Sequence, residues 1–161
     1  MLGFLVDNLS TSQLSYLLTT QGNDVVFYQR NEYPLIQKVY TSILPMMEAI
    51  HHKGTLIATD LDSANFLRKI VSPMRKLYYP WFVGESLRYP NDYMYSSAIF
   101  TSPELEIIAR SKDYARQLEI LGCDVKAIIE DCSFTGFNKY IQEHTYKRPY
   151  FNEEKIMKCL V

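Results

Sequence analysis

The chain has 161 residues, a formal net charge of −1 and 47% hydrophobic residues, which suits one domain with a core of its own. Its basic residues are scattered, so the charge pattern excludes a footprint for nucleic acid or an anionic membrane. No apolar stretch approaches the ~18 residues of a membrane span. The N-terminus lacks a signal peptide, and the three cysteines lack metal-binding spacing, so we expect a cytoplasmic protein.

Short apolar runs, each leading into a polar or charged residue, recur along the chain. The predicted strands cover residues 2–6, 25–28, 55–59, 76–82, 105–109 and 125–129. Helical spacing predicts helices after Ser10, along the apolar stripe from Leu35 to Ile50 with a kink or restart at Pro45, and over residues 63–70, 112–121, 135–144 and 151–161. Alternating strands and helices predict a single domain, a three-layer α/β/α sandwich around a mainly parallel sheet of about five or six strands.

Three segments are harder to assign. Pro80 lies inside a predicted strand, which indicates an edge position in the sheet or an early end of the strand. Residues 96–104 fit either a strand or a short helix. The loose basic cluster from Arg68 to Lys76 is typical of a solvated helix face and loop.

The carboxyl ends of the strands are the expected ligand-binding edge, because ligands of parallel sheets bind outside those ends. The polar and aromatic residues that would line it are Asp7, Asn8, Arg30, Asp60, Asp62, Trp81, Glu85, Arg110, Ser111 and Asp131. The Gly-x-Gly-x-x-Gly fingerprint of dinucleotide sites is absent, so no dinucleotide cofactor is predicted. The pattern assigns no metal site of its own.

Asp60 and Asp62 are the candidate catalytic residues, since they directly follow a predicted strand. Two carboxylates at this spacing can share a divalent cation, or divide the roles of nucleophile and acid. Aspartate is also a good helix N-cap. Both interpretations stay open at the level of sequence.

The aromatic run around Trp81 is a candidate sugar-binding wall. Tyr78, Tyr79, Trp81 and Phe82 precede Glu85, and aromatic faces beside a carboxylate suit the CH groups and hydroxyls of a sugar. The alternative is a strand partly buried in the core. If the strand alternates regularly, Tyr79 and Trp81 share one face and Tyr78 lies on the other.

Two stretches resemble one Rossmann-like half of a glycosyltransferase with the two-domain B-type fold. GTLIATDLDSANFL (54–67) is similar to the strand, turn and helix that face the cleft in that family, and LEIIARSKDYARQLEILGCDVKAIIEDCSF (105–134) to its recurring strand–Ser–helix–Gly–strand unit. The resemblance implies that Arg110 and Ser111 face the cleft, that Arg110 meets a phosphate or carboxylate, and that Trp81 stacks on a sugar. Asp60 or Glu85 would bond its hydroxyls.

The same resemblance implies a ligand class and a partner. The ligand would be a sugar, a sugar nucleotide or a glycosylated acceptor. The second half of such enzymes, which usually binds the nucleotide sugar, would begin near where these 161 residues end. A second domain acting in trans, or another copy of this chain, would then complete the site, and this half alone would have no complete activity.

Two alternatives remain. Asp60 and Asp62 also resemble the first motif of haloacid-dehalogenase-type phosphatases, with Lys112 and the Glu130–Asp131 pair as further echoes. That resemblance implies a magnesium-dependent phosphohydrolase in which Asp60 is the nucleophile, Asp62 the acid/base and Asp131 a metal ligand. A strand at 105–109 would break this match. The last alternative is a non-catalytic interaction domain that binds a partner through its aromatic segment and C-terminal helix.

Overall fold

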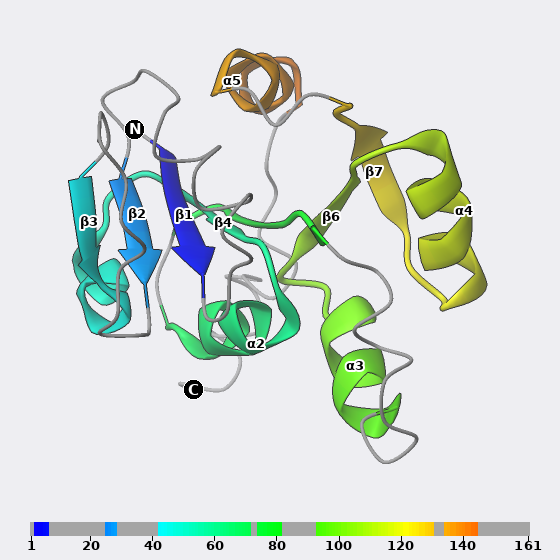
Figure 1. The fold of residues 1–161 in the computed structure, drawn as a ribbon, viewed down its shortest axis with the longest axis horizontal. Coiled ribbons are helices and arrows are strands. Elements are labelled where there is room, and N and C mark those ends of the chain that lie inside the picture. The colour runs from blue at the N-terminus through cyan, green and yellow to red at the C-terminus, as the bar shows by residue number, and fades with distance from the viewer. Residues whose placement is uncertain are drawn as a thin grey trace, which may run out of the picture.

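The computed structural model describes residues 2–6, 25–28, 42–71, 74–81, 93–130 and 134–144. Within these ranges seven strands form one sheet in which every pairing is parallel, in the order β3-β2-β1-β4-β5-β6-β7 (Figure 1). The strands are β1 (Leu2–Val6), β2 (Val25–Tyr28), β3 (Ser42–Pro45), β4 (Thr55–Ala58), β5 (Lys76–Tyr78), β6 (Glu106–Ala109) and β7 (Val125–Ile128). The chain reverses its direction of travel across the sheet between β1 and β4, which is the topological switch point.

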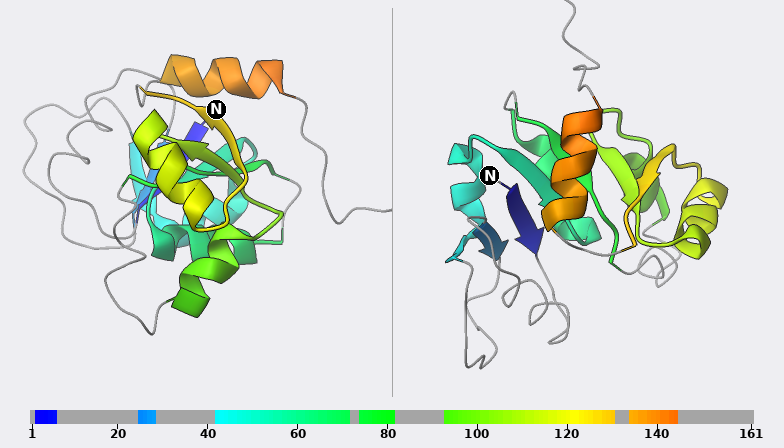
Figure 2. Two further views of the ribbon diagram at one scale, coloured as in Figure 1. Left: turned by 90° about the vertical axis from the view of Figure 1, so that its right-hand side faces the viewer. Right: turned by 90° about the horizontal axis from the view of Figure 1, so that it is seen from above.

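Helices cover both faces of the sheet, so the predicted three-layer α/β/α, Rossmann-like sandwich is confirmed. The 3₁₀-helix η1 (Met46–His51), α2 (Leu61–Lys69), α3 (Tyr93–Phe100) and α4 (Lys112–Ile120) pack on one face. Helix α5 (Phe134–Glu143) lies across the middle of the other face (Figure 2). Among the helices that the structure describes, none combines the length and apolar character needed to cross a bilayer.

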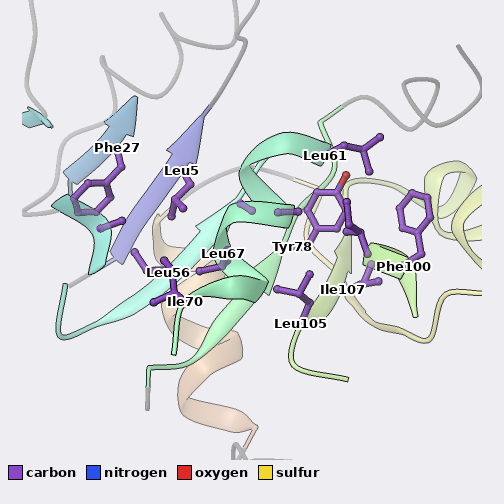
Figure 3. Packing of buried hydrophobic residues seen from close by; sticks show 14 of the residues in the cluster. Leu5, Phe27, Leu56, Leu61, Leu67, Ile70, Tyr78, Phe100, Leu105 and Ile107 are labelled. Atoms are coloured by element: carbon purple, nitrogen blue, oxygen red, sulfur yellow. The ribbon is translucent and has the colours of Figure 1, made fainter. Parts of the chain in front are cut away.

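Each face of the sheet has its own core. The α2-side cluster gathers Leu5, Phe27, Leu56, Tyr78 and Ile107 from the strands around Leu61 and Leu67 of α2 (Figure 3). The α5-side cluster gathers the alternate strand residues around α5, including Phe4, Ile57, Leu77, Ile108 and Phe137. Because successive strand residues point to opposite faces, a strand apolar at every position serves both cores.

Helix α4 shows how the sequence sets the limits of a helix. Ser111 is its N-cap, and its side-chain oxygen accepts from the Tyr114 N–H at 3.1 Å. Gly122 follows the helix with φ of 92°, a conformation that favours glycine. The Cys123 N–H then bonds to the Leu118 carbonyl at 2.9 Å and the Gly122 N–H to Glu119 at 3.0 Å, which is a Schellman ending. The predicted helix from residue 112 is therefore confirmed.

Among the described residues of the apolar stripe from Leu35 to Ile50, only those after Pro45 are helical, so the predicted restart at Pro45 is confirmed and the helix before it is not. Residues 42–45 form strand β3, and η1 follows directly. Strand β3 pairs with β2, from Ser42 beside Val25 to Pro45 beside Tyr28, so tertiary pairing overrides the helical periodicity. This strand raises the count to seven, above the predicted five or six.

The predicted strand that contains Pro80, residues 76–82, does not lie at the edge of the sheet. Strand β5 lies between β4 and β6, so the edge prediction was wrong, while the early end is confirmed at Tyr78. Beyond it, Tyr79 N–H and Trp81 N–H still donate to β4-side carbonyls at 2.8 and 3.0 Å. Pro80 lies between them, so its missing donor would have pointed toward β6 rather than β4. Residues 93–100 are helix α3, which answers the open assignment of residues 96–100.

Gly3 provides a stability prediction for the centre of the sheet. A Cβ atom at this position would lie 2.7 Å from Leu56 Cδ2 and 2.8 Å from Phe27 Cε2. Both neighbours are buried, so they have little room to move. We expect Gly3→Ala to lower the free energy of unfolding by about 1–3 kcal/mol, measured by urea titration. The exposed Lys53→Ala variant is the control, and equal stability of both variants would contradict the prediction.

Candidate functional site at the carboxyl edge of the sheet

The turn between β4 and α2 lies at the switch point. Thr59 donates to the Leu5 carbonyl through its hydroxyl at 3.0 Å and its N–H at 3.2 Å, so it joins the ends of β4 and β1. Asp60 is only 6% exposed, and its carboxylate accepts from the Ser63 N–H at 2.8 Å. The Ser63 hydroxyl in turn accepts from the Asp60 N–H at 3.2 Å. This reciprocal capping box shows that Asp60 is the N-cap of α2.

The two aspartates of the turn have different environments. Asp60 is buried, whereas Asp62 is exposed in the first turn of α2, where a negative charge suits the helix dipole. In the part of the chain that the structure describes, no three His, Cys, Asp or Glu side chains are grouped to hold a metal ion. Asp131, the third carboxylate of the phosphatase interpretation, lies outside the described residues. The described geometry therefore fits a role for both aspartates at the start of α2, with Asp60 as the N-cap and Asp62 in the first turn.

Trp81 and Arg110 meet where β5 and β6 end. Arg110 places its guanidinium carbon 4.1 Å from the centre of the Trp81 ring. Its Nη1 also donates to the Trp81 carbonyl at 3.2 Å. The Trp81 N–H donates to the Thr59 carbonyl at 3.0 Å, so a chain of contacts continues across the ends of β4, β5 and β6. A guanidinium stacked on an indole is a favourable cation–π arrangement.

Arg110 has no ion-pair partner among the described residues. Its guanidinium has five N–H donors, and the contact with Trp81 uses a donor on Nη1. Arginine is suited to phosphate and carboxylate groups, because its planar fork matches two of their oxygens at once. Arg110 therefore offers positive charge at the expected ligand-binding edge.

The tyrosines of the aromatic run match the alternative of a strand partly buried in the core rather than a sugar-binding wall. Tyr79 and Trp81 belong to the α5-side cluster and Tyr78 to the α2-side cluster, so the predicted alternation is confirmed. Tyr78 stacks on Phe100 with a centroid distance of 6.1 Å, and Tyr79 donates its hydroxyl to the Ile129 carbonyl at 2.6 Å. Both tyrosines are buried core residues. Arg110 covers one face of the Trp81 indole, so a sugar ring would have to use the opposite face.

The structure brings together only part of the predicted site. Asp60, Trp81, Arg110 and Ser111 lie at the ends of three adjacent strands. The hydroxyl of Ser111 serves α4 as its N-cap. The predictions that fall outside the described residues are Asp7, Asn8, Arg30, Glu85 and Asp131.

Sequence reasoning missed Thr59, and it placed Ser63 at the start of the helix without the hydrogen bonds that its hydroxyl accepts. Thr59 fixes the switch point, and the Ser63 hydroxyl accepts from its N–H at 3.3 Å as well as from Asp60. A Thr-Asp-x-x-Ser run after a strand is the available signal for this turn, because hydroxyls and carboxylates cap helices.

Burial raises the pKa of the Cys123 thiol to about 12, so this cysteine stays protonated and is part of the hydrophobic core.

The amino edge of the sheet holds a second charged cluster, which sequence reasoning placed in solvent. Arg75 forms a two-pronged ion pair with Glu106, at 2.6 and 2.7 Å, and their side chains are 9% and 15% exposed. Lys76 is 4% exposed, and its Nζ lies 3.8 Å from Glu104 Oε2. The expectation of a solvated basic loop was therefore wrong for Arg75 and Lys76, which are fixed at the starts of β5 and β6.

Comparisons with known proteins add no family to this geometry. No family model matches the chain, and no curated protein or solved structure is significantly similar to it. The structure establishes the α/β fold, and any functional inference has to come from the residues at the edge of the sheet.

Proposed function

We propose that this chain is a glycosyltransferase-like domain that binds a sugar, a sugar nucleotide or a glycosylated acceptor against the carboxyl ends of β4, β5 and β6. One observation carries the proposal: Arg110, without an ion-pair partner in the described ranges, is held by Trp81 at the end of β6. The parallel sheet, with its switch point between β1 and β4, supports a ligand at the same edge.

The residues at this edge have different roles in the proposal. Arg110 binds the phosphate of a sugar nucleotide, or a carboxylate of an acidic sugar. Trp81 holds Arg110 through its ring and its carbonyl. Asp60 shapes the turn by capping α2, so the hydroxyls of the sugar are left to other side chains. A second domain or a second copy of the chain would complete a transferase site.

The phosphohydrolase alternative has less support. Residues 106–109 form β6, in the segment where a strand breaks the match to the phosphatase motifs. The carboxylate of Asp60 is buried and accepts from the Ser63 N–H, whereas a nucleophile must reach a phosphorus atom. No specific observation favours the interaction domain.

A thermal-shift panel tests the proposal. Uridine, guanosine and thymidine diphosphate sugars, free nucleotides and simple sugars are compared, with magnesium plus a phosphomonoester mimic as a separate arm. A ligand at ~100 times its dissociation constant adds about 2.7 kcal/mol of stability, which raises Tm by about 5–10 °C for a domain of this size. We expect such a rise with at least one nucleotide sugar.

Variants identify the site that produces the shift. Arg110→Ala should abolish it, while Arg116→Ala, which removes an exposed arginine of α4, should keep it. A shift only with magnesium and the phosphate mimic, lost in Asp60→Asn, would replace the proposal with the phosphatase. A panel without any shift would contradict the proposal and favour the interaction domain.

A further inference from the structure

The donors of the switch-point turn are already used within the chain. Thr59 N–H and Asp60 N–H both point to the Ser63 hydroxyl, at 3.3 and 3.2 Å, and the Ser63 N–H points to the Asp60 carboxylate. This carboxylate occupies the start of α2, where an anionic ligand would otherwise meet backbone N–H groups. A second anion would be repelled there, so the charged group of a ligand needs another place on this edge.

Arg110 is the described cation best placed for that group. Its guanidinium carbon lies over the Trp81 ring, 4.1 Å from the ring centre, and its Nη1 donates to the Trp81 carbonyl at 3.2 Å. Trp81 is itself bonded to Thr59 of the neighbouring strand end through its N–H. A side chain that is already oriented loses less rotamer freedom when it binds, so an oxyanion gains affinity from this arrangement.

We infer that Trp81 is a positioning residue that presents Arg110 to an oxyanion of the ligand, and that this contact selects phosphorylated or carboxylated ligands over neutral sugars. The inference builds on the proposed function, which places the ligand at this edge. It narrows the ligand class, because a neutral sugar or a neutral acceptor would leave the guanidinium without an anionic partner.

The pair can first be tested without any ligand. Trp81 is the only tryptophan of the chain, so its fluorescence reports this one position. We expect Arg110→Ala to change the emission intensity or maximum of Trp81, because the charge on its face is removed. Arg116→Ala should leave the spectrum unchanged. An unchanged spectrum in both variants would overturn the stacked pair itself.

The ligand class is tested by titration of the wild-type protein, followed by Trp81 emission. The probes are uridine diphosphate, uridine diphosphate glucose, pyrophosphate, glucuronate and glucose. We expect saturable changes with probes that carry an oxyanion and none with glucose. Binding by the phosphate probes alone assigns the site to phosphate, and binding by glucuronate extends it to carboxylates. Arg110→Lys should weaken binding at least tenfold, because an ammonium cannot form the planar fork.

The positioning role is tested through Trp81 itself, with calorimetric dissociation constants because these variants lack the fluorophore. Trp81→Ala should raise the dissociation constant for uridine diphosphate about tenfold, which lies between the values for an exposed and a fully desolvated cation–π contact. Both variants keep the backbone carbonyl, but Trp81→Phe also keeps a ring, so it should retain most of the affinity. A purely structural role would lower Tm and leave the dissociation constant unchanged in both variants.

One result would overturn this inference alone, and a second would also count against the proposed function. Glucose binding as tight as that of uridine diphosphate glucose would overturn the oxyanion selection and keep a sugar site. Absence of binding by every probe, with a Trp81 spectrum that still responds to Arg110→Ala, would confirm the pair as a structural contact. In that case the oxyanion site would be wrong, and the proposed function would be wrong as well if the thermal-shift panel also showed no shift.

Discussion

Replacing Glu106 with alanine is expected to lower the free energy of unfolding by about 3 kcal/mol, because it leaves a buried arginine without its counter-charge. Glu106 accepts from Arg75 Nε at 2.6 Å and Nη2 at 2.7 Å, and from the Tyr140 hydroxyl at 2.9 Å. Truncation removes all three bonds while Arg75 stays shielded from water. Urea titration of both proteins measures the loss.

A surface ion pair is the matched control for this prediction. Lys126 and Asp124 lie 2.6 Å apart, but their side chains are 48% and 82% exposed. We expect Asp124→Ala to change stability by less than about 0.5 kcal/mol. Glu106→Gln keeps the shape of the side chain and should fall between the two. Equal small losses at Glu106 and Asp124 would show that the Arg75 pair contributes no more than a surface pair.

Arg75 explains why this network matters for the fold. Its Nη1 donates to the carbonyls of Ile141 and His144, at 3.1 and 2.8 Å, so it satisfies carbonyl groups at the end of α5. It also lies 5.3 Å from the centre of the Tyr140 ring. The hydrogen bond to Glu106 raises the pKa of Arg75, and desolvation raises the pKa of Tyr140. The Arg75 side chain therefore connects the starts of β5 and β6 to the end of α5.

The two arginines at the opposite edges of the sheet differ in the way that the proposed function predicts. Arg75 at the amino edge is held by a carboxylate, two carbonyls and a ring. Arg110 at the carboxyl edge meets only Trp81 among the described residues. A charge that only stabilises the fold is best paired within it, whereas a charge that binds a ligand keeps donors for that ligand.

The interior strands of the sheet could be predicted from sequence because they are buried on both faces. Runs such as Leu2–Val6 and Val25–Tyr28 are apolar at nearly every position, which is typical of interior parallel strands. Strand β3 could not be predicted in this way. Its four residues, Ser42–Pro45, continue an apolar stripe with helical spacing, and only the pairing with β2 makes them a strand.

The candidate site could be predicted only in part, for a similar reason. Strand ends placed Asp60, Trp81 and Arg110 at one edge, and the parallel sheet confirms that placement. The contact of Arg110 with Trp81 joins residues 29 positions apart, and it depends on β5 and β6 being neighbours. The sequence left both capping and catalysis open for Asp60, and only the direction of its carboxylate toward the Ser63 N–H decides for capping. Likewise, burial of Arg75 could not be inferred from a basic cluster.

Replacing Phe137 with alanine is expected to lower the free energy of unfolding by about 4 kcal/mol, the other large effect in this protein. Phe137 is fully buried, and its ring meets Phe4 and Tyr79 edge to face, at centroid distances of 5.7 and 5.1 Å. These partners come from β1 and from the end of β5, so the ring fastens α5 to the middle of the sheet. The loss combines buried apolar area, two aromatic contacts and the cavity left behind.

The control lies on the same helix. Lys139 is exposed on α5, and Lys139→Ala should change stability by less than about 0.5 kcal/mol. Phe137→Leu fills most of the space and should cost less than Phe137→Ala. If Phe137→Ala lost no more stability than Lys139→Ala, α5 would contribute little to the core.

Because Tyr79 contacts both Phe137 and Trp81, with ring centroids at 5.1 and 6.4 Å, the Trp81 emission of the Phe137 variants should also change. That change would link the packing of α5 to the proposed ligand-binding edge.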